Sequence, residues 1–170
     1  AGLLSLEAQL AVVQQACALG AHTLRLTGGE PLLSDRLWPL LEAVAAARSR
    51  PDSPFHGLQQ VTLTTNGALL TSERARLLRA LGVDRLTVSL DAVHPDAVAR
   101  MAGLQGGASA GERLLGQVLA GVEAARAAGF APSLGQLKLN SVIQRGLNDD
   151  QLIPLAALAR DHGVELRLIE

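Results

Sequence analysis

The amino-acid sequence predicts an α/β fold whose parallel sheet curves into an incomplete barrel with a polar concave face. Five short runs of alternating apolar and polar residues are separated by helical patterns. The connections between these runs are too long for hairpins, so successive strands are joined by crossovers and lie parallel. Each run also collects its polar residues on one side, whereas a sheet covered by helices on both faces is apolar on both.

Composition and charge favour one soluble, globular domain. The chain has 170 residues, of which 48% are hydrophobic and 18% charged, as expected for a folded chain and not for a disordered one. A net charge of −1 gives no general attraction to nucleic acid or to an anionic membrane. No apolar run approaches the roughly 18 residues of a membrane span, and no basic residue precedes Arg25, so a signal peptide is not expected. We expect a cytoplasmic protein.

The first half of the chain contains recognisable start and stop signals. Ser5 is a suitable N-cap, and Gly20 and Gly82 follow helical patterns as stops. Two prolines and a glycine between residues 49 and 57 indicate a surface loop. The predicted elements are a helix over 5–19, a strand over 23–27, a helix from Ser34 or Asp35 to about 47, a strand over 60–65 and a helix over 71–81.

The second half repeats the alternation. The glycines between Gly103 and Gly111 do not form a phosphate loop, because no strand precedes them and no Gly-Lys-Ser/Thr follows. They are predicted to form a flexible connection. The elements expected are a strand over 84–90, a short helix within 94–111, a helix over 112–128, a strand over 136–143, a helix capped by Asn148 or Asp149 to about 162, and a strand over 165–169.

The two faces of the predicted strands differ in chemistry. A closed eight-stranded barrel would fill its interior with branched aliphatic side chains, so a polar inner face favours an incomplete barrel that binds something polar. The apolar face consists of Leu24, Leu26, Val61, Leu63, Leu86, Val88, Leu90, Leu137, Leu139, Leu166 and Leu168. The polar face consists of Arg25, Thr27, Thr62, Thr64, Thr87, Ser89, Lys138, Asn140 and Arg167.

Three cations on the polar face indicate an anionic ligand. Arg25, Lys138 and Arg167 are in phase, and Glu165 is the one acid that could accompany them. Cations gathered in a cavity are costly unless a bound anion or neighbouring acids pair with them. The pattern predicts a polyanion, most simply a phosphate ester. The alternative is that each cation reaches the rim and pairs with a surface acid.

The end of the first strand predicts a small-molecule site. Gly28 and Gly29 allow a backbone turn or a close approach of a ligand, and Pro31 ends the strand. Ligands of α/β proteins commonly bind at the carboxyl ends of the strands.

Six motifs in order carry a family resemblance: Arg25-Leu-Thr-Gly-Gly-Glu-Pro31, Leu63-Thr-Thr-Asn-Gly67, Val88-Ser-Leu-Asp91, Lys138-Leu-Asn140, Arg145-Gly-Leu-Asn-Asp149 and Arg167-Leu-Ile-Glu170. Together they resemble the GTP 3′,8-cyclase family of radical S-adenosylmethionine (SAM) enzymes, which serve molybdenum cofactor biosynthesis. The resemblance implies a partial (βα)6 TIM-type barrel. It also implies that residues 1–170 are the central part of one barrel domain, with the N-terminal strand and the C-terminal region missing.

The resemblance also implies roles for individual residues. In that family a 5′-deoxyadenosyl radical made from SAM abstracts hydrogen from the GTP ribose, and C3′ then bonds to guanine C8. By motif, the SAM-binding residues are Gly28, Gly29, Glu30 and Ser89, and the GTP-binding residues are Arg25, Thr64, Lys138 and, less closely matched, Arg167. Cyclic pyranopterin monophosphate synthase is the downstream partner implied.

The cysteine content departs from the family. Its members hold two 4Fe–4S clusters with cysteine motifs, and such clusters need several thiolates. This chain has only Cys17, on the apolar stripe of the first helix, where a small core residue is expected. No catalytic or metal-binding residue is therefore assigned, and the chain by itself is expected not to cleave SAM reductively. A missing edge strand leaves backbone unpaired, so aggregation or a homodimer is expected.

Two other interpretations stay open. Another radical SAM enzyme, peptide-modifying or cofactor-maturing, would share the Gly-Gly-Glu-Pro elbow but should lack the cations of the concave face. A non-catalytic nucleotide-binding fragment would keep those cations without the cluster cysteines, as this chain does.

Overall fold

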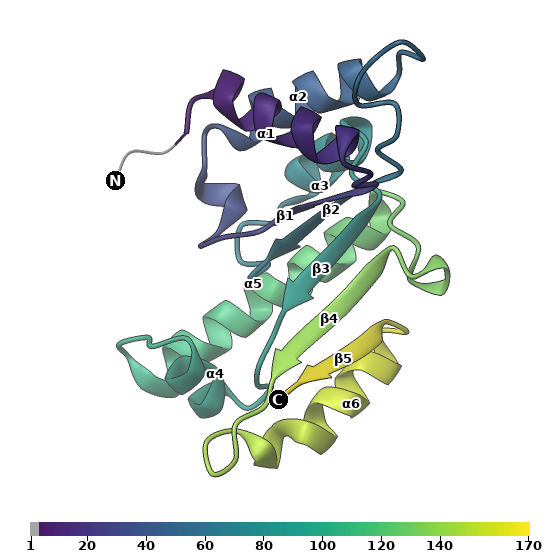
Figure 1. The fold of residues 1–170 in the computed structure, drawn as a ribbon. Coiled ribbons are helices and arrows are strands. Elements are labelled where there is room, and N and C mark those ends of the chain that lie inside the picture. The colour runs from purple at the N-terminus through teal and green to yellow at the C-terminus, as the bar shows by residue number, and fades with distance from the viewer. Residues whose placement is uncertain (1–3) are drawn as a thin grey trace.

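The computed structural model describes residues 4–170 and contains one five-stranded sheet, all parallel, in the order β1-β2-β3-β4-β5 (Figure 1). The strands are β1 (Thr23–Leu26), β2 (Gln60–Thr65), β3 (Arg85–Ser89), β4 (Leu137–Val142) and β5 (Glu165–Ile169). A doubly wound sheet reverses its strand order at a switch point. The sequential order confirms the predicted barrel-type sheet.

The helices cover one side of this sheet. They are α1 (Leu6–Ala18), α2 (Leu37–Arg48), α3 (Ser72–Ala80), α4 (Pro95–Met101), α5 (Gly107–Ala127) and α6 (Leu152–Asp161). Figure 1 shows them around the outside of the curved sheet, from α1 and α2 at the top, past α5, to α6 at the bottom. The core lies between, and Leu63, Leu86 and Leu137 of the predicted apolar face have no exposed surface. The apolar side of the strands therefore packs on the helices, as predicted.

The predicted starts of α1 and α3 agree with the structure, whereas that of α2 does not. Ser5 Oγ accepts from the Ala8 amide at 3.2 Å and caps α1, and the pKa of Glu7 is lowered by its own backbone N–H and by Ser5. Thr71 caps α3 in the same way. The predicted cap of α2 at Ser34 or Asp35 is wrong. A short 3₁₀ helix, Pro31–Leu33, intervenes, and α2 begins at Leu37 after Arg36, without a side-chain cap.

Part of the glycine-rich stretch predicted as a connection is helical, and only residues 102–106 form a turn between α4 and α5. Helix α5 begins at Gly107 instead of residue 112, and Gly111 lies inside it against α4. A Cβ built on Gly111 would stand 1.9 Å from the Pro95 carbonyl oxygen. Gly121 has a similar role, because its Cβ would stand 2.7 Å from the Gly67 carbonyl oxygen. These glycines permit close packing of helix on backbone.

The loop over 49–57 is more ordered than its composition suggests. Phe55 is buried in the core. Arg48, just before the loop, donates to the Leu58 carbonyl at 2.8 Å and pairs with Asp84 at 2.9 Å. Asp84 in turn accepts from the Val61 amide at 2.8 Å. These bonds tie together the amino ends of β2 and β3. Within residues 4–170, no helix has the length and apolarity needed to cross a membrane.

Candidate functional site

The elbow after β1 is organised by the carboxylate of Glu30. Its Oε1 accepts from the Leu32 amide at 3.0 Å and from Thr65 Oγ1 at 2.7 Å. Its Oε2 accepts from the Asn66 amide at 2.7 Å. The donors from Thr65 and Asn66 link the elbow to the end of β2, and the Leu32 amide is a third donor from the elbow itself. A carboxylate with about four lone-pair sites retains room for another donor. The sequence predicted the position of Glu30 but not this cross-strand role.

Gly28 and Gly29 present bare backbone at the same edge. Gly28 has φ 143°, a value that favours glycine, and a Cβ on either residue would meet nothing within 4 Å. Within residues 4–170, neither glycine forms a backbone hydrogen bond. Their exposed N–H and C=O groups can therefore bind a ligand directly, which fits the predicted SAM-binding elbow.

Ser89, at the carboxyl end of β3, lies on a neighbouring cavity of about 280 Å³. This cavity combines polar groups with an apolar wall from α4 and α5, as a ligand with a flat apolar part would require. Its lining residues are Asn66, Ser89, Leu90, Asp91, Ala92, Val98, Met101, Ala102, Leu114 and Val118. Asn66 lines this cavity and also donates to Glu30, so the cavity beside Ser89 adjoins the Glu30 network.

The second cavity occupies the concave face, as the alternation of the strands predicted. The sheet register places Arg25 beside Thr62 and Thr62 beside Arg85, and the next row runs from Thr64 through Thr87 to Lys138 and Glu165. The cavity has a volume of about 270 Å³ and is lined by Arg25, Thr62, Thr64, Arg85, Thr87, Lys138, Asn140, Glu165, Leu166 and Arg167. It unites all four predicted GTP residues.

The charges of this concave pocket are unequally paired. Lys138 Nζ lies 2.7 Å from Glu165 Oε2. The guanidinium groups of Arg25, Arg85 and Arg167 form no ion pair with any carboxylate in the described part of the chain. The alternative that every cation pairs with a surface acid therefore holds for Lys138 alone. Four cations and one carboxylate leave a strongly positive pocket.

Arg85 is a pocket residue that the sequence reasoning missed. It opens β3 and is in phase with Thr87, which was assigned to the polar face. The alternation with period two contained the signal, because Arg85 lies inside the strand predicted over 84–90 and two residues before Thr87.

Asn148 was interpreted as a helix cap, and the structure corrects this. It is fully buried and makes no capping bond to the following helix. Its Nδ2 donates to the carbonyl oxygens of Asp91 and Val142 at 2.7 and 2.9 Å, and its Oδ1 accepts from the Gln144 amide at 2.8 Å. Asn148 thus joins the loops that follow β3 and β4, and the loop after β3 lines the cavity beside Ser89 through Asp91 and Ala92.

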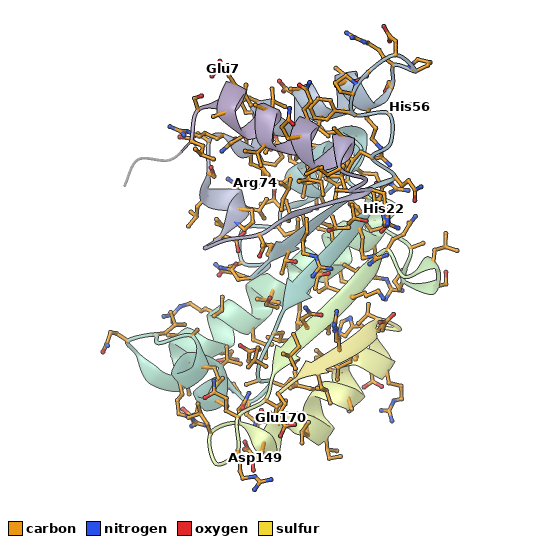
Figure 2. All side chains as sticks on the ribbon, in the orientation of Figure 1. Glu7, His22, His56, Arg74, Asp149 and Glu170 are labelled. Atoms are coloured by element: carbon orange, nitrogen blue, oxygen red, sulfur yellow. The ribbon has the colours of Figure 1, made fainter. Side chains whose placement is uncertain are left out.

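A metal centre finds no support in the residues that the structure describes. Residues 4–170 contain no group of three or more His, Cys, Asp or Glu side chains placed to hold an ion. Cys17 is half-buried and packs against the core, as expected. Figure 2 shows labelled charged residues such as Glu7 and Glu170 at opposite ends of the molecule.

Residues 1–159 match the family described as the Radical SAM superfamily. The chain belongs to the radical SAM superfamily. This superfamily uses SAM with a 4Fe–4S cluster. The bare Gly28-Gly29 backbone and the adjoining cavity fit SAM, whereas a single cysteine does not fit a cluster that needs several thiolate ligands.

Two relatives similar in sequence carry the name GTP 3′,8-cyclase. A GTP 3′,8-cyclase from Synechococcus sp. (strain WH7803) is 66% identical over 169 residues, covering 99% of this chain and 49% of the relative. A GTP 3′,8-cyclase from Xanthomonas campestris pv. campestris (strain B100) is 42% identical over 159 residues, covering 94% of this chain and 41% of the relative. The chain therefore spans about half the length of the curated relatives it matches.

Solved structures show the same fold at low identity. The radical SAM methyltransferase TsrM from Kitasatospora setae superposes with a TM-score of 0.66 at 18% identity, covering 98% of this chain and 30% of that chain. The protein anSMEcpe with bound AdoMet and a Kp18Cys peptide gives a TM-score of 0.67 at 16% identity, covering 99% of this chain and 43% of that chain. These likenesses confirm a radical SAM partial barrel.

Proposed function

We propose that this chain forms the central part, residues 1–170, of the barrel domain of a cytoplasmic GTP 3′,8-cyclase in molybdenum cofactor biosynthesis. The observation that carries the proposal is the concave pocket, in which Arg25, Lys138 and Arg167 converge beside Thr64. A polyphosphate satisfies such a set of cations. The 66% identity to a protein named GTP 3′,8-cyclase supports GTP as the polyphosphate.

The two cavities have distinct proposed ligands. Gly28 and Gly29 bind the methionyl part of SAM through their backbone groups. Glu30 accepts a hydrogen bond from the SAM ammonium at a remaining lone pair, and Ser89 contacts SAM from β3. Arg25, Thr64, Lys138 and Arg167 bind GTP, with the arginines directed to phosphate oxygens, for which guanidinium groups are well shaped. The chain's own contribution is to bind, orient and neutralise charge.

SAM, when bound beside a cluster, supplies the deoxyadenosyl radical chemistry of the superfamily. Because Cys17 alone cannot hold a cluster, the 170-residue chain is predicted to bind its ligands without cleaving SAM. Formation of 5′-deoxyadenosine by the isolated chain would contradict this. The product of the cyclase would pass to cyclic pyranopterin monophosphate synthase, which stays a prediction.

A second candidate is a nucleotide-binding module without catalysis. The single cysteine favours it for this chain, while the elbow of Gly28, Gly29 and Glu30 favours a radical SAM enzyme. A SAM titration distinguishes the two candidates. Part of a radical SAM enzyme should bind SAM at the elbow, whereas a nucleotide-binding module should not.

The test is a calorimetric titration of the chain with GTP at low and high salt, beside Lys138→Ala. We expect salt-sensitive binding that Lys138→Ala weakens about tenfold, the effect of losing one charge-assisted contact. Arg50→Ala is the matched control, because Arg50 is exposed and its 3.8 Å ion pair with Asp52 lies in the 49–57 loop. Equal weakening by both variants would show general electrostatics instead of a site.

A further inference from the structure

The one carboxylate of the concave pocket has a defined position. Glu165 lies directly opposite Lys138 in the register of β4 and β5. The ammonium Nζ contacts both carboxylate oxygens, at 2.7 Å to Oε2 and 2.8 Å to Oε1. Lys138 is thereby already engaged by an anion that belongs to the chain itself.

The two partners of this pair differ in exposure. The Lys138 side chain is 22% exposed and that of Glu165 52%. A half-buried ammonium is costly to leave unpaired, whereas an exposed carboxylate on the edge strand can rotate into water at little cost. The pair can therefore open on the side of Glu165 while Lys138 stays in the pocket.

The arginines around the Lys138–Glu165 pair favour the binding of a multiply charged anion. Arg25, Arg85 and Arg167 line the same pocket and have no carboxylate partner among the described residues. An anion that contacts only Lys138 merely replaces one carboxylate by another negative group. An anion with several charges can contact the arginines as well and gains more than the pair loses.

We propose that Glu165 is a built-in counter-ion of the phosphate pocket, which occupies Lys138 until a polyphosphate displaces it. Glu165 thus lowers the affinity of the pocket for every anion that contacts Lys138. Anions of low charge, which gain little from the arginines, then bind only weakly. This inference rests on the proposed function, because it assigns a specificity-determining residue to the same pocket.

The experiment compares the 170-residue chain with Glu165→Gln and with Glu112→Gln. Glutamine keeps the size of Glu165 and removes its charge, and Glu112 is an exposed residue of α5 outside the pocket. The probes are GTP, inorganic triphosphate, inorganic phosphate and SAM, each titrated by calorimetry at fixed salt and pH, with circular dichroism as a check on folding.

Glu165→Gln is expected to bind GTP and triphosphate about tenfold more tightly than the unaltered chain, since one repulsive charge in contact with the ligand is removed. The affinity for inorganic phosphate, expected to be weak in the unaltered chain, should also rise. Glu112→Gln has the same change in net charge and should shift the affinities less than twofold.

Failure of the inference can be told from failure of the proposed function. If Lys138→Ala weakens GTP binding and Glu165→Gln does not strengthen it, the counter-ion role is wrong and the nucleotide site stands. If Glu165→Gln strengthens triphosphate binding but no variant binds SAM, the counter-ion role stands and the cyclase assignment is contradicted. Absence of anion binding in every variant overturns both.

Discussion

At the scale of single residues, Glu30 decides the geometry of the elbow. Glu30→Gln keeps an oxygen acceptor but replaces the other oxygen with an NH₂ group, which cannot accept from the Asn66 or Leu32 amide. The retained oxygen can stay at the Oε1 position, where Leu32 and Thr65 donate, so the exposed Asn66 amide loses its acceptor and faces an NH₂ group, at a cost of about 1 kcal/mol. We expect this loss in the free energy of unfolding, measured by urea denaturation, together with weaker SAM binding.

Glu42→Gln is the control for this change. Glu42 is exposed on α2 and takes part in no hydrogen bond or ion pair recorded among residues 4–170, so its substitution should leave both stability and SAM binding unchanged. Unaltered SAM binding in Glu30→Gln, with stability reduced, would assign Glu30 a purely structural role.

The sequence revealed most of the residues of the site but not their contacts. Arg25, Lys138 and Arg167 could be placed on one face because strand alternation is local. The bond from Thr65 to Glu30 joins residues 35 positions apart, and no local pattern encodes it. Asn148 was misassigned for the same reason, since a buried amide that bridges two loops resembles a cap until the loops are placed.

At the scale of elements, the packing of α4 on α5 depends on one glycine. Gly111→Ala would place a methyl group 1.9 Å from the Pro95 carbonyl oxygen and 2.9 Å from the Ala99 amide nitrogen, both backbone atoms. Because α4 must then move away, we expect a loss of about 3 kcal/mol in the free energy of unfolding, measured by urea denaturation.

Gly116→Ala provides a matched control on the same helix. Gly116 is exposed, and an added Cβ meets nothing within 4 Å. The same substitution should therefore stabilise the chain by about 0.5–1 kcal/mol through helix propensity. Stabilisation of equal size at both positions would show that helix propensity, and not the close approach of α4, decides the effect at Gly111.

The elements were predicted well where a local signal exists. Ser5 and Thr71 cap α1 and α3 as their side chains suggest. The starts of α2 and α5 were misplaced because tertiary contacts decide them. The 3₁₀ turn before α2 follows from Glu30 bonding to Leu32. In α5, Gly111 is required because α4 packs closely against it.

At the scale of the whole molecule, β5 is an edge strand with apolar side chains exposed. Leu168 is 50% and Ile169 38% exposed, and they border a cavity of about 510 Å³ that Ile143 and Leu152 also line. Exposed apolar edges promote association. We expect concentration-dependent self-association, and Leu168→Lys should shift the protein toward monomer in sedimentation velocity experiments.

The control for the edge is Ile153→Lys. Ile153 is 79% exposed on α6 and does not line that cavity, so this variant should associate like the unaltered chain. A chain that sediments as a monomer at every concentration, before any substitution, would contradict the prediction.

The sequential strand order has a consequence for how the protein is made. Each strand pairs with the strand that precedes it along the chain, so no part of the sheet has to wait for a distant partner. As the polypeptide leaves the ribosome from its N-terminus, each new βα unit can add to an edge that already exists. Synthesis and assembly can then advance together, and a pause in translation would leave a shorter sheet of the same kind instead of a misfolded one.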